Sequence, residues 1–101
     1  MAKVIWSNGA LGDADWAAEY IAQDSPDQAS LFVERLHEAV KRLEDFPASG
    51  RRIPEAEDPA FREIIVGPYR VMYEVGGDIV RITAVVHGAR KPDMKRPPWR
   101  Q

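Results

Sequence analysis

Five basic side chains stand on or next to three β-prone runs in the second half of the chain. Guanidinium groups bind phosphates and carboxylates through paired hydrogen bonds, and a histidine transfers protons near neutral pH. On one concave face, such a set binds anions and is suited to cleaving RNA, with the histidine moving the proton and the arginines stabilising the phosphate. The set consists of Arg62, Arg70, Arg81, His87 and Arg90.

These side chains also have structural interpretations. A histidine at a strand end followed by glycine is commonly a hydrogen-bonded structural residue, and Arg70 is able to pair with Glu63 or Glu74 on a sheet. The chain has no cysteine and only two histidines, far apart in sequence, which argues against a metal centre. It has no phosphate-binding glycine loop and no nucleophile elbow. We therefore expect no metal and no cofactor.

Residues 61–90, which position most of this set, predict a three-stranded antiparallel meander. Gly67-Pro68 and Gly76-Gly77-Asp78 are turn signals between strand-length runs. Strict alternation gives the middle strand one face of Tyr69, Val71, Tyr73 and Val75. It gives the last strand an apolar face of Val80, Ile82, Ala84 and Val86. The opposite face of the meander then carries Arg70, Arg81 and His87.

The first part of the chain predicts a short strand followed by a helix. Residues 3–6 are β-prone and suited to an edge of the meander. Residues 10–23 repeat apolar side chains at helical spacing. Trp16 and Tyr20 lie four residues apart in this helix, and we interpret them as packing anchors rather than a ligand-stacking platform.

A second helix is predicted from Ser25 onward. Ser25 followed by Pro26 and Gln28 is the signature of a capped helix start. Pro47 is expected to end the helix near Phe46. Its apolar stripe, which we expect to cover the meander, consists of Ala29, Phe32, Val33, Leu36, Val40, Leu43 and Phe46.

Two segments lack periodicity. Residues 47–60 are rich in proline and predict a loop without regular structure. From about residue 91 the chain is basic and proline-rich, which predicts an extended tail whose Trp99 docks on its own domain or on a partner. We expect one domain over residues 1–101, of the α+β class with two layers.

Charge is divided unevenly along the chain. Residues 1–50 hold four Lys/Arg and nine Asp/Glu, whereas residues 51–101 hold ten Lys/Arg and seven Asp/Glu. A basic surface on an acidic chain attracts a nucleic acid or an acidic protein segment within a Debye length of about 8 Å. The lack of cysteine fits a reducing compartment. With no secretory leader or membrane-length apolar run, we expect a cytoplasmic protein.

Several short motifs follow one another in a characteristic order. They are Tyr20-Ile21-Ala22 with Ser25-Pro26, Gly50-Arg51 with Pro54-Glu55, Arg62-Glu63, Tyr69-Arg70 with Tyr73, and His87-Gly88 with Arg90. Together with the element order, from Val4 to Arg90, they resemble the RelE/ParE superfamily of bacterial toxins from type II toxin–antitoxin modules. The resemblance implies an N-terminal strand that joins a small antiparallel sheet and a two-helix hairpin packed across one face.

Within that superfamily the long hairpin and the ending His87-Gly88-Ala89-Arg90 resemble ParE-type members more closely. This resemblance implies a toxin that poisons DNA gyrase without nuclease activity. It also implies a cognate antitoxin whose C-terminal segment wraps over the helices and the sheet. The expected partner-binding residues lie on the basic face and tail: Arg62, Arg70, Arg81, Arg90 and Trp99.

Two alternatives stay open. RelE-type members are ribosome-dependent mRNA endonucleases, and the catalytic set they imply here is Arg62, Arg70, His87 and Arg90. That set is incomplete, because Ile64 stands where a lysine is expected and no tyrosine follows His87. The second alternative is an inactive member that keeps only its partner-binding role. Whether the chain is an enzyme therefore stays open, with a non-enzymatic toxin preferred.

Overall fold

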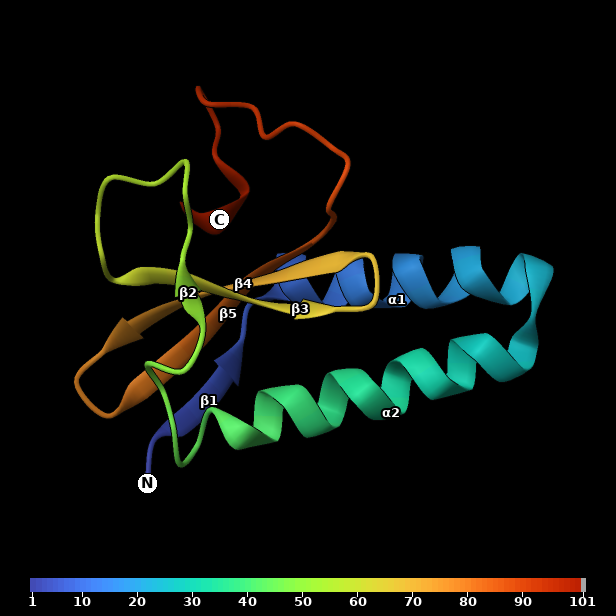
Figure 1. Ribbon diagram of the computed structural model, residues 1–101, viewed down its shortest axis with the longest axis horizontal. Helices are drawn as coiled ribbons and strands as arrows, with labels where there is room; N and C mark the ends of the chain where they lie inside the picture. The colour runs from blue at the N-terminus through green and yellow to red at the C-terminus, as the bar shows by residue number, and fades with distance from the viewer. Residues whose placement is uncertain (101) are drawn as a thin grey trace.

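A helix hairpin packed on one face of a five-stranded sheet forms the frame of the computed structural model, which describes residues 1–100 (Figure 1). The α+β fold expected from the sequence is confirmed. Its elements are β1 (Lys3–Trp6), α1 (Asn8–Asp24), α2 (Pro26–Arg42), β2 (Arg51–Arg52), β3 (Phe61–Val66), β4 (Tyr69–Gly76), β5 (Ile79–His87) and a 3-10 turn (Pro98–Arg100).

The sheet has the strand order β1-β5-β4-β3-β2. Strands β3, β4 and β5 form the predicted antiparallel meander, and Gly67 and Gly77 occupy its turns with φ values of 56° and 57° that favour glycine. The N-terminal strand joins an edge as predicted, but it runs parallel to β5 from Lys3↔Ile79 to Trp6↔Ile82. The sheet is therefore mixed rather than purely antiparallel.

The prediction that residues 47–60 lack regular structure is wrong at one point. Arg51 and Arg52 form the edge strand β2, which pairs with Glu63 and Arg62 of β3. Gly50 makes this pairing possible by coming close to the sheet. Its backbone N–H donates to the Tyr73 hydroxyl at 2.9 Å, and a Cβ at this position would lie 2.5 Å from that oxygen.

The predicted apolar face of β5 is also wrong, because a β-bulge interrupts the alternation. Met72 pairs with Ala84 and Tyr73 pairs with Ile82, so Thr83 is an extra residue on β5. Its hydroxyl donates to the Met72 carbonyl at 3.3 Å. Val80, Ile82 and Val85 consequently face the helices, whereas Ala84 and Val86 face the opposite side.

Both helices begin at serine caps. The Ser7 hydroxyl oxygen accepts from Ala10 N at 3.0 Å, and that of Ser25 accepts from Gln28 N at 3.2 Å, as the capping signature predicts. Helix α2 ends at Arg42, earlier than the predicted end near Phe46, and residues 43–45 form a turn. The Phe46 N–H donates back to the Arg42 carbonyl at 2.9 Å, which continues the winding past the helix end.

The main core lies between the helices and the sheet. Helix α2 contributes Phe32, Leu36 and Val40 from its predicted stripe, and β4 contributes Tyr69, Val71 and Tyr73 from its predicted face. Four side chains predicted to pack there are exposed instead: Trp16 (64%), Tyr20 (54%), Val33 (37%) and Phe46 (62%). The packing role predicted for Trp16 and Tyr20 is therefore wrong.

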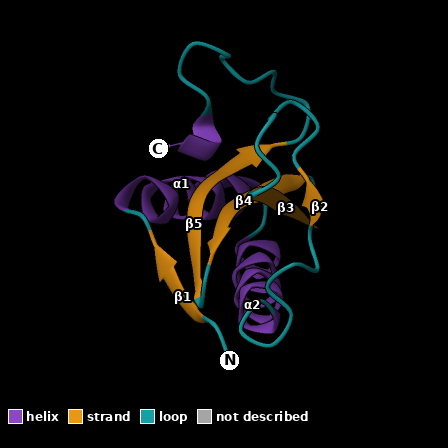
Figure 2. Ribbon diagram, turned by 90° about the vertical axis from the view of Figure 1, so that its left-hand side faces the viewer, coloured by secondary structure: helices purple, strands orange, loops and turns teal. Residues whose placement is uncertain are grey.

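A second apolar cluster, which we call the outer cluster, lies on the outer face of the sheet, the face opposite α2, where Figure 2 shows the C-terminal 3-10 turn. Trp99 is only 3% exposed at its centre, and the Arg100 guanidinium lies over the Phe61 ring. The tail thus folds back over the sheet rather than staying extended. The buried members of this cluster are Ile53, Ala56, Phe61, Met72, Ala84 and Trp99.

The far end of the helix hairpin projects beyond the sheet. In Figure 1 the connection between α1 and α2 lies well past the turn that joins β3 to β4. Within residues 1–100, neither helix combines the length and the apolarity needed to cross a membrane.

Gly50→Ala is expected to destabilise the fold by about 1–3 kcal/mol, because the new methyl group overlaps the Tyr73 hydroxyl and the Glu63 carbonyl. Gly12→Ala is the matched control. Nothing lies within 4 Å of the position that a Cβ of residue 12 would take in α1. The higher helix propensity of alanine is therefore expected to raise the free energy of unfolding by about 0.5–1 kcal/mol. Urea unfolding of both variants measures the two effects, and equal stabilities would contradict the close approach at Gly50.

Candidate functional site

Arg70 lies in a cluster of four charged side chains that we call the Glu63 cluster: Arg51, Glu55, Glu63 and Arg70. Arg70 Nε donates to Glu63 Oε1 at 2.6 Å, while Nη1 and Nη2 donate to the two oxygens of Glu55 at 3.0 and 2.6 Å. Arg51 Nε donates to the other oxygen of Glu63 at 2.6 Å. Of the two partners proposed for Arg70, the structure selects Glu63 and not Glu74.

Burial makes this cluster electrostatically strong. Glu63 is 1% exposed and Arg70 is 7% exposed, so each charge depends on its partners rather than on water. The hydrogen bonds from Arg70 hold the pKa of Glu55 below its usual range. The carboxylates of Glu55 and Glu63 in turn raise the pKa of Arg70. Each of the three guanidinium nitrogens of Arg70 therefore donates a hydrogen bond within the protein.

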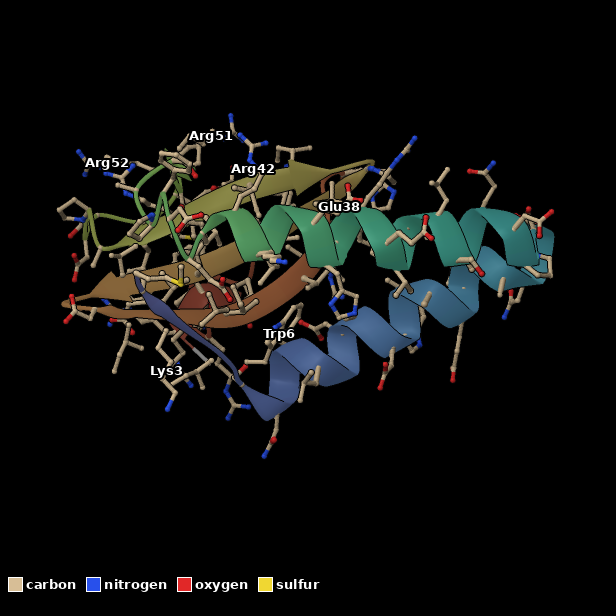
Figure 3. All side chains as sticks on the ribbon, turned by 90° about the horizontal axis from the view of Figure 1, so that it is seen from below. Lys3, Trp6, Glu38, Arg42, Arg51 and Arg52 are labelled. Atoms are coloured by element: carbon tan, nitrogen blue, oxygen red, sulfur yellow. The ribbon has the colours of Figure 1, made fainter. Side chains whose placement is uncertain are left out.

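Arg62 lies on the opposite face of the sheet from Arg70. It pairs in register with Tyr73, whose ring is in the main core, and its Nη1 donates to the Gly50 carbonyl at 2.8 Å. Arg62 thus supports the chain turn that leads into β2. Figure 3 shows Arg51 and Arg52 on the same edge of the molecule, together with Arg42 from the end of α2.

The remaining residues of the predicted basic face also lie on different faces of the sheet. Arg81 pairs in register with Glu74 and shares the outer face of the sheet with Arg70. His87 lies beyond the bulge and faces the helices, where its ring meets Tyr69 edge to face at a centroid distance of 5.4 Å. Trp99 is buried in the outer cluster. The single basic face predicted from the sequence is therefore divided between two faces.

One groove does bring predicted residues together, and we call it the α1 groove. It has a volume of about 620 Å³ and lies between α1 and the ends of β4 and β5. Both His87 and Arg90 line it, beside the exposed rings of Trp16 and Tyr20, which stack with centroids 5.4 Å apart. Its full lining is Gly12, Asp13, Trp16, Ala17, Tyr20, Tyr69, Val85, Val86, His87 and Arg90.

Asp13 holds α1 against the strand that supplies His87. Strand β1 pairs with β5 only as far as Ile82, and beyond that point the N–H of Val85 donates to Asp13 Oδ2 at 3.0 Å. Burial raises the pKa of Asp13, while this N–H and the charge of Arg90 oppose the shift. No spacing in the sequence singles out Asp13, because its role depends on where β1 stops.

Within residues 1–100 no group of three or more His, Cys, Asp or Glu side chains is placed to hold a metal ion. The lining of the α1 groove consists mainly of aromatic rings, with two basic side chains, His87 and Arg90, and the carboxylate of Asp13. Such a lining suits the docking of a partner segment or the stacking of a flat ligand.

Comparison with known proteins places the chain among toxins. The family described as "ParE toxin of type II toxin-antitoxin system, parDE" matches residues 4–92. Toxin RelE2 of Caulobacter vibrioides is 35% identical over 91 residues, which cover 89% of this chain and 99% of RelE2. Putative toxin Y4kP of Sinorhizobium fredii is 36% identical over 87 residues, covering 84% of this chain and 86% of Y4kP.

A solved structure supports the fold. A chain of the chromosomal ParDE TA system from P. aeruginosa is similar with a TM-score of 0.70 and 24% identity. The match covers 86% of this chain and 96% of that chain. The same arrangement of helices and sheet is thus present in a protein of that system.

Removing the charge of Glu63 is expected to be severely destabilising. Glu63→Gln leaves Arg51 without its ion pair and the buried Arg70 with only Glu55, and breaking a buried pair costs about 3–5 kcal/mol. Glu34→Gln on the exposed side of α2 is the control, with an expected change within about 0.5 kcal/mol. Chemical denaturation of the two variants tests this difference, and a Glu63→Gln variant as stable as the control would refute the role of the cluster.

The pairing of Glu55 predicts a pH-dependent stability. The pKa of Glu55 is lowered from 4.5 in the folded protein. The ionised carboxylate therefore contributes its full stabilisation of the fold above pH 4.5, and this stabilisation is lost as the pH falls through the folded-state pKa. Glu55→Gln is therefore expected to be less stable than the parent protein near pH 7, with the gap closing as the pH falls below 4.5. Denaturant unfolding across this range measures the difference in stability. Asp13, whose pKa is also shifted, is present in both proteins, so its titration does not change that difference. A gap independent of pH would contradict the pairing.

Proposed function

The chain belongs to the ParE toxin family of type II toxin–antitoxin systems, in which a cognate antitoxin is the toxin's partner, and we propose that it arrests growth by inhibiting DNA gyrase. In this proposal the chain acts in the cytoplasm by binding its target rather than by cutting RNA. The proposal extends the family membership by naming the target.

The observation that carries the proposal is the engagement of Arg70. All three nitrogens of its guanidinium donate to carboxylate oxygens of Glu55 or Glu63, and the side chain is almost fully buried. A phosphate group would have to displace two carboxylates and would then be repelled by both. One arginine of the set implied by the nuclease hypothesis is thus poorly suited to bind RNA.

The separation of the other candidate groups supports the same conclusion. Arg70 and His87 lie on opposite faces of the sheet, so one phosphate cannot contact both in this structure. Arg62 is bonded to the Gly50 carbonyl on the helix side. Of the residues in the nuclease set, His87 and Arg90 lie together, and neither Arg62 nor Arg70 joins them.

The mRNA endonuclease remains the second candidate because of one observation. His87 and Arg90 line the same groove as two exposed aromatic rings, and this combination of groups suits a nucleotide. The name of toxin RelE2 of Caulobacter vibrioides also points to the RelE branch of the superfamily.

The partner-binding residues expected from the sequence divide in this proposal. Arg62, Arg81 and Arg90 remain candidates for contact with a partner. Arg70 and Trp99 stabilise the outer face of the sheet and reach a partner only if that face opens.

Purified chain is expected to inhibit DNA supercoiling by gyrase and to cause cleaved DNA to accumulate. His87→Ala is expected to inhibit equally well, since the proposal gives that side chain no chemical role, and added cognate antitoxin is expected to restore supercoiling. A ribosome-programmed mRNA cleavage assay runs in parallel. Codon-positioned mRNA cuts that disappear in His87→Ala, with gyrase unaffected, would replace the proposal with the endonuclease.

A further inference from the structure

A second cavity adjoins the α1 groove, and we call it the tail cavity. It has a volume of about 270 Å³ and lies between the start of α1, the outer face of β5 and the tail that follows β5. The tail leaves the end of β5, arches away from the sheet and returns to it at the 3-10 turn (Figure 1). Asp13, Val86 and Arg90 line both the tail cavity and the α1 groove, so the two cavities meet at these residues.

Basic side chains are the main charged groups of the tail cavity. Arg90, Lys91 and Arg96 line it, and all three are exposed. Within residues 1–100, neither Arg90 nor Lys91 forms a salt bridge, whereas two carboxylates bind Arg70. Exposed cations that lie around one cavity retain hydrogen-bond donors for a phosphate group.

Two carboxylates also line the tail cavity, and both already accept a backbone hydrogen bond. Asp13 accepts from Val85 N, and Asp93 Oδ1 accepts from Lys95 N at 2.9 Å. Three cations therefore face two carboxylates whose charge is partly compensated. The balance of charge in this lining is positive and favours an anion.

The α1 groove supplies aromatic surface next to these cations. The stacked rings of Trp16 and Tyr20 are 64% and 54% exposed, and His87 and Arg90 line the groove beside them. The acidic residues of α1 other than Asp13 line neither cavity. Exposed aromatic rings bind nucleobases by stacking, whatever the base. The groove volume of about 620 Å³ falls in the range of about 300–1,000 Å³ that is usual for small-molecule sites.

A nucleotide uses both cavities at once. An apolar segment of a partner protein would fill the groove and leave the cations of the tail cavity without a counter-charge. Inorganic phosphate would bind those cations and leave the rings bare. The tail itself borders the tail cavity, whose volume of about 270 Å³ suits a compact anion better than a continuing polypeptide. A base joined to a phosphate through a ribose matches aromatic rings followed by cations.

We propose that the α1 groove and the tail cavity together bind a free nucleotide, with its base on the rings of Trp16 and Tyr20 and its phosphate among the three cations of the tail cavity. This inference goes beyond the proposed function and does not depend on gyrase being the target. It also differs from the endonuclease alternative. The nucleotide is bound and not cleaved, and its phosphate lies away from Arg62 and Arg70.

The first experiment compares AMP with its two parts. AMP titrated into the purified chain is expected to bind saturably by isothermal titration calorimetry and to raise the Tm. Adenosine lacks the phosphate and inorganic phosphate lacks the base, so each is expected to bind at least about tenfold more weakly. The inference is overturned if AMP does not bind, or if either part binds as tightly as AMP does.

The second experiment removes the rings. Trp16→Ala/Tyr20→Ala is expected to weaken AMP binding by at least about tenfold, because the base loses its stacking surface. Phe46→Ala is the matched control, since Phe46 is 62% exposed and lines neither cavity. The control is expected to bind AMP as the parent chain does. Equal binding by the ring variant and the parent would contradict the assignment of the base.

The third experiment removes the cations. Arg90→Gln/Lys91→Gln is expected to weaken AMP binding by at least about tenfold and to leave adenosine binding unchanged. Lys41→Gln/Arg42→Gln, at the end of α2, removes the same charge outside both cavities and is expected to change neither. Circular dichroism and urea unfolding show whether each variant is folded. Equal losses for AMP and adenosine would overturn the assignment of the phosphate.

A short single-stranded oligoadenylate distinguishes a free nucleotide from a nucleic acid. Asp15 and Glu19 are exposed on α1 and directly precede the two rings in the chain, so they are expected to repel the further phosphates of a strand. The oligoadenylate is therefore expected to bind more weakly than AMP, and tighter binding would overturn the proposal in favour of a nucleic acid. All these measurements use the chain alone, so a failure of the gyrase proposal leaves them unaffected.

Discussion

The carboxylate of Glu63 is the buried charge on which the attachment of β2 and the loop after it depends. A carboxylate that is 1% exposed is stable only while positive partners replace its lost hydration. Those partners are Arg51 of the edge strand β2 and Arg70 of β4, and Arg70 also binds Glu55 in the following loop. The cluster therefore fastens β2 and the loop to the sheet, and the loop in turn supplies Ile53 and Ala56 to the surface on which Trp99 packs.

Local signals predict much of this fold. The turns at Gly67 and Gly77 and the cap at Ser25 depend on only a few neighbouring residues, and the structure has them where the sequence places them. The end of α2 and the face of His87 depend on distant contacts instead. One extra residue at Thr83 reverses the alternation of β5, and nothing in an otherwise regular β-prone run announces it. That single residue is why Arg81 and His87 lie on opposite faces.

The candidate site was harder to predict than the fold, because the type of a residue does not show whether its side chain is exposed and able to bind a partner. Arginines attract attention in a sequence. Glu63 was one of the partners predicted for Arg70, but nothing in the sequence singled out Glu55, fifteen residues away. Trp16 and Tyr20 have helical spacing that suggests packing, but α1 turns its small residues Ala10 and Ala17 to the core and leaves the rings outside. What distinguishes the α1 groove is exposure, which only the assembled tertiary structure shows.

The parallel pairing of β1 with β5 has a consequence for the synthesis of this toxin. Lys3 finds its partner Ile79 only after 76 further residues have been added to the chain. The α1 groove likewise combines α1 with residues 85–90. A nascent chain on the ribosome thus has neither a closed sheet nor a complete groove until β5 and the residues that follow it have been translated. The α1 groove is therefore complete only after residue 90 has left the ribosome.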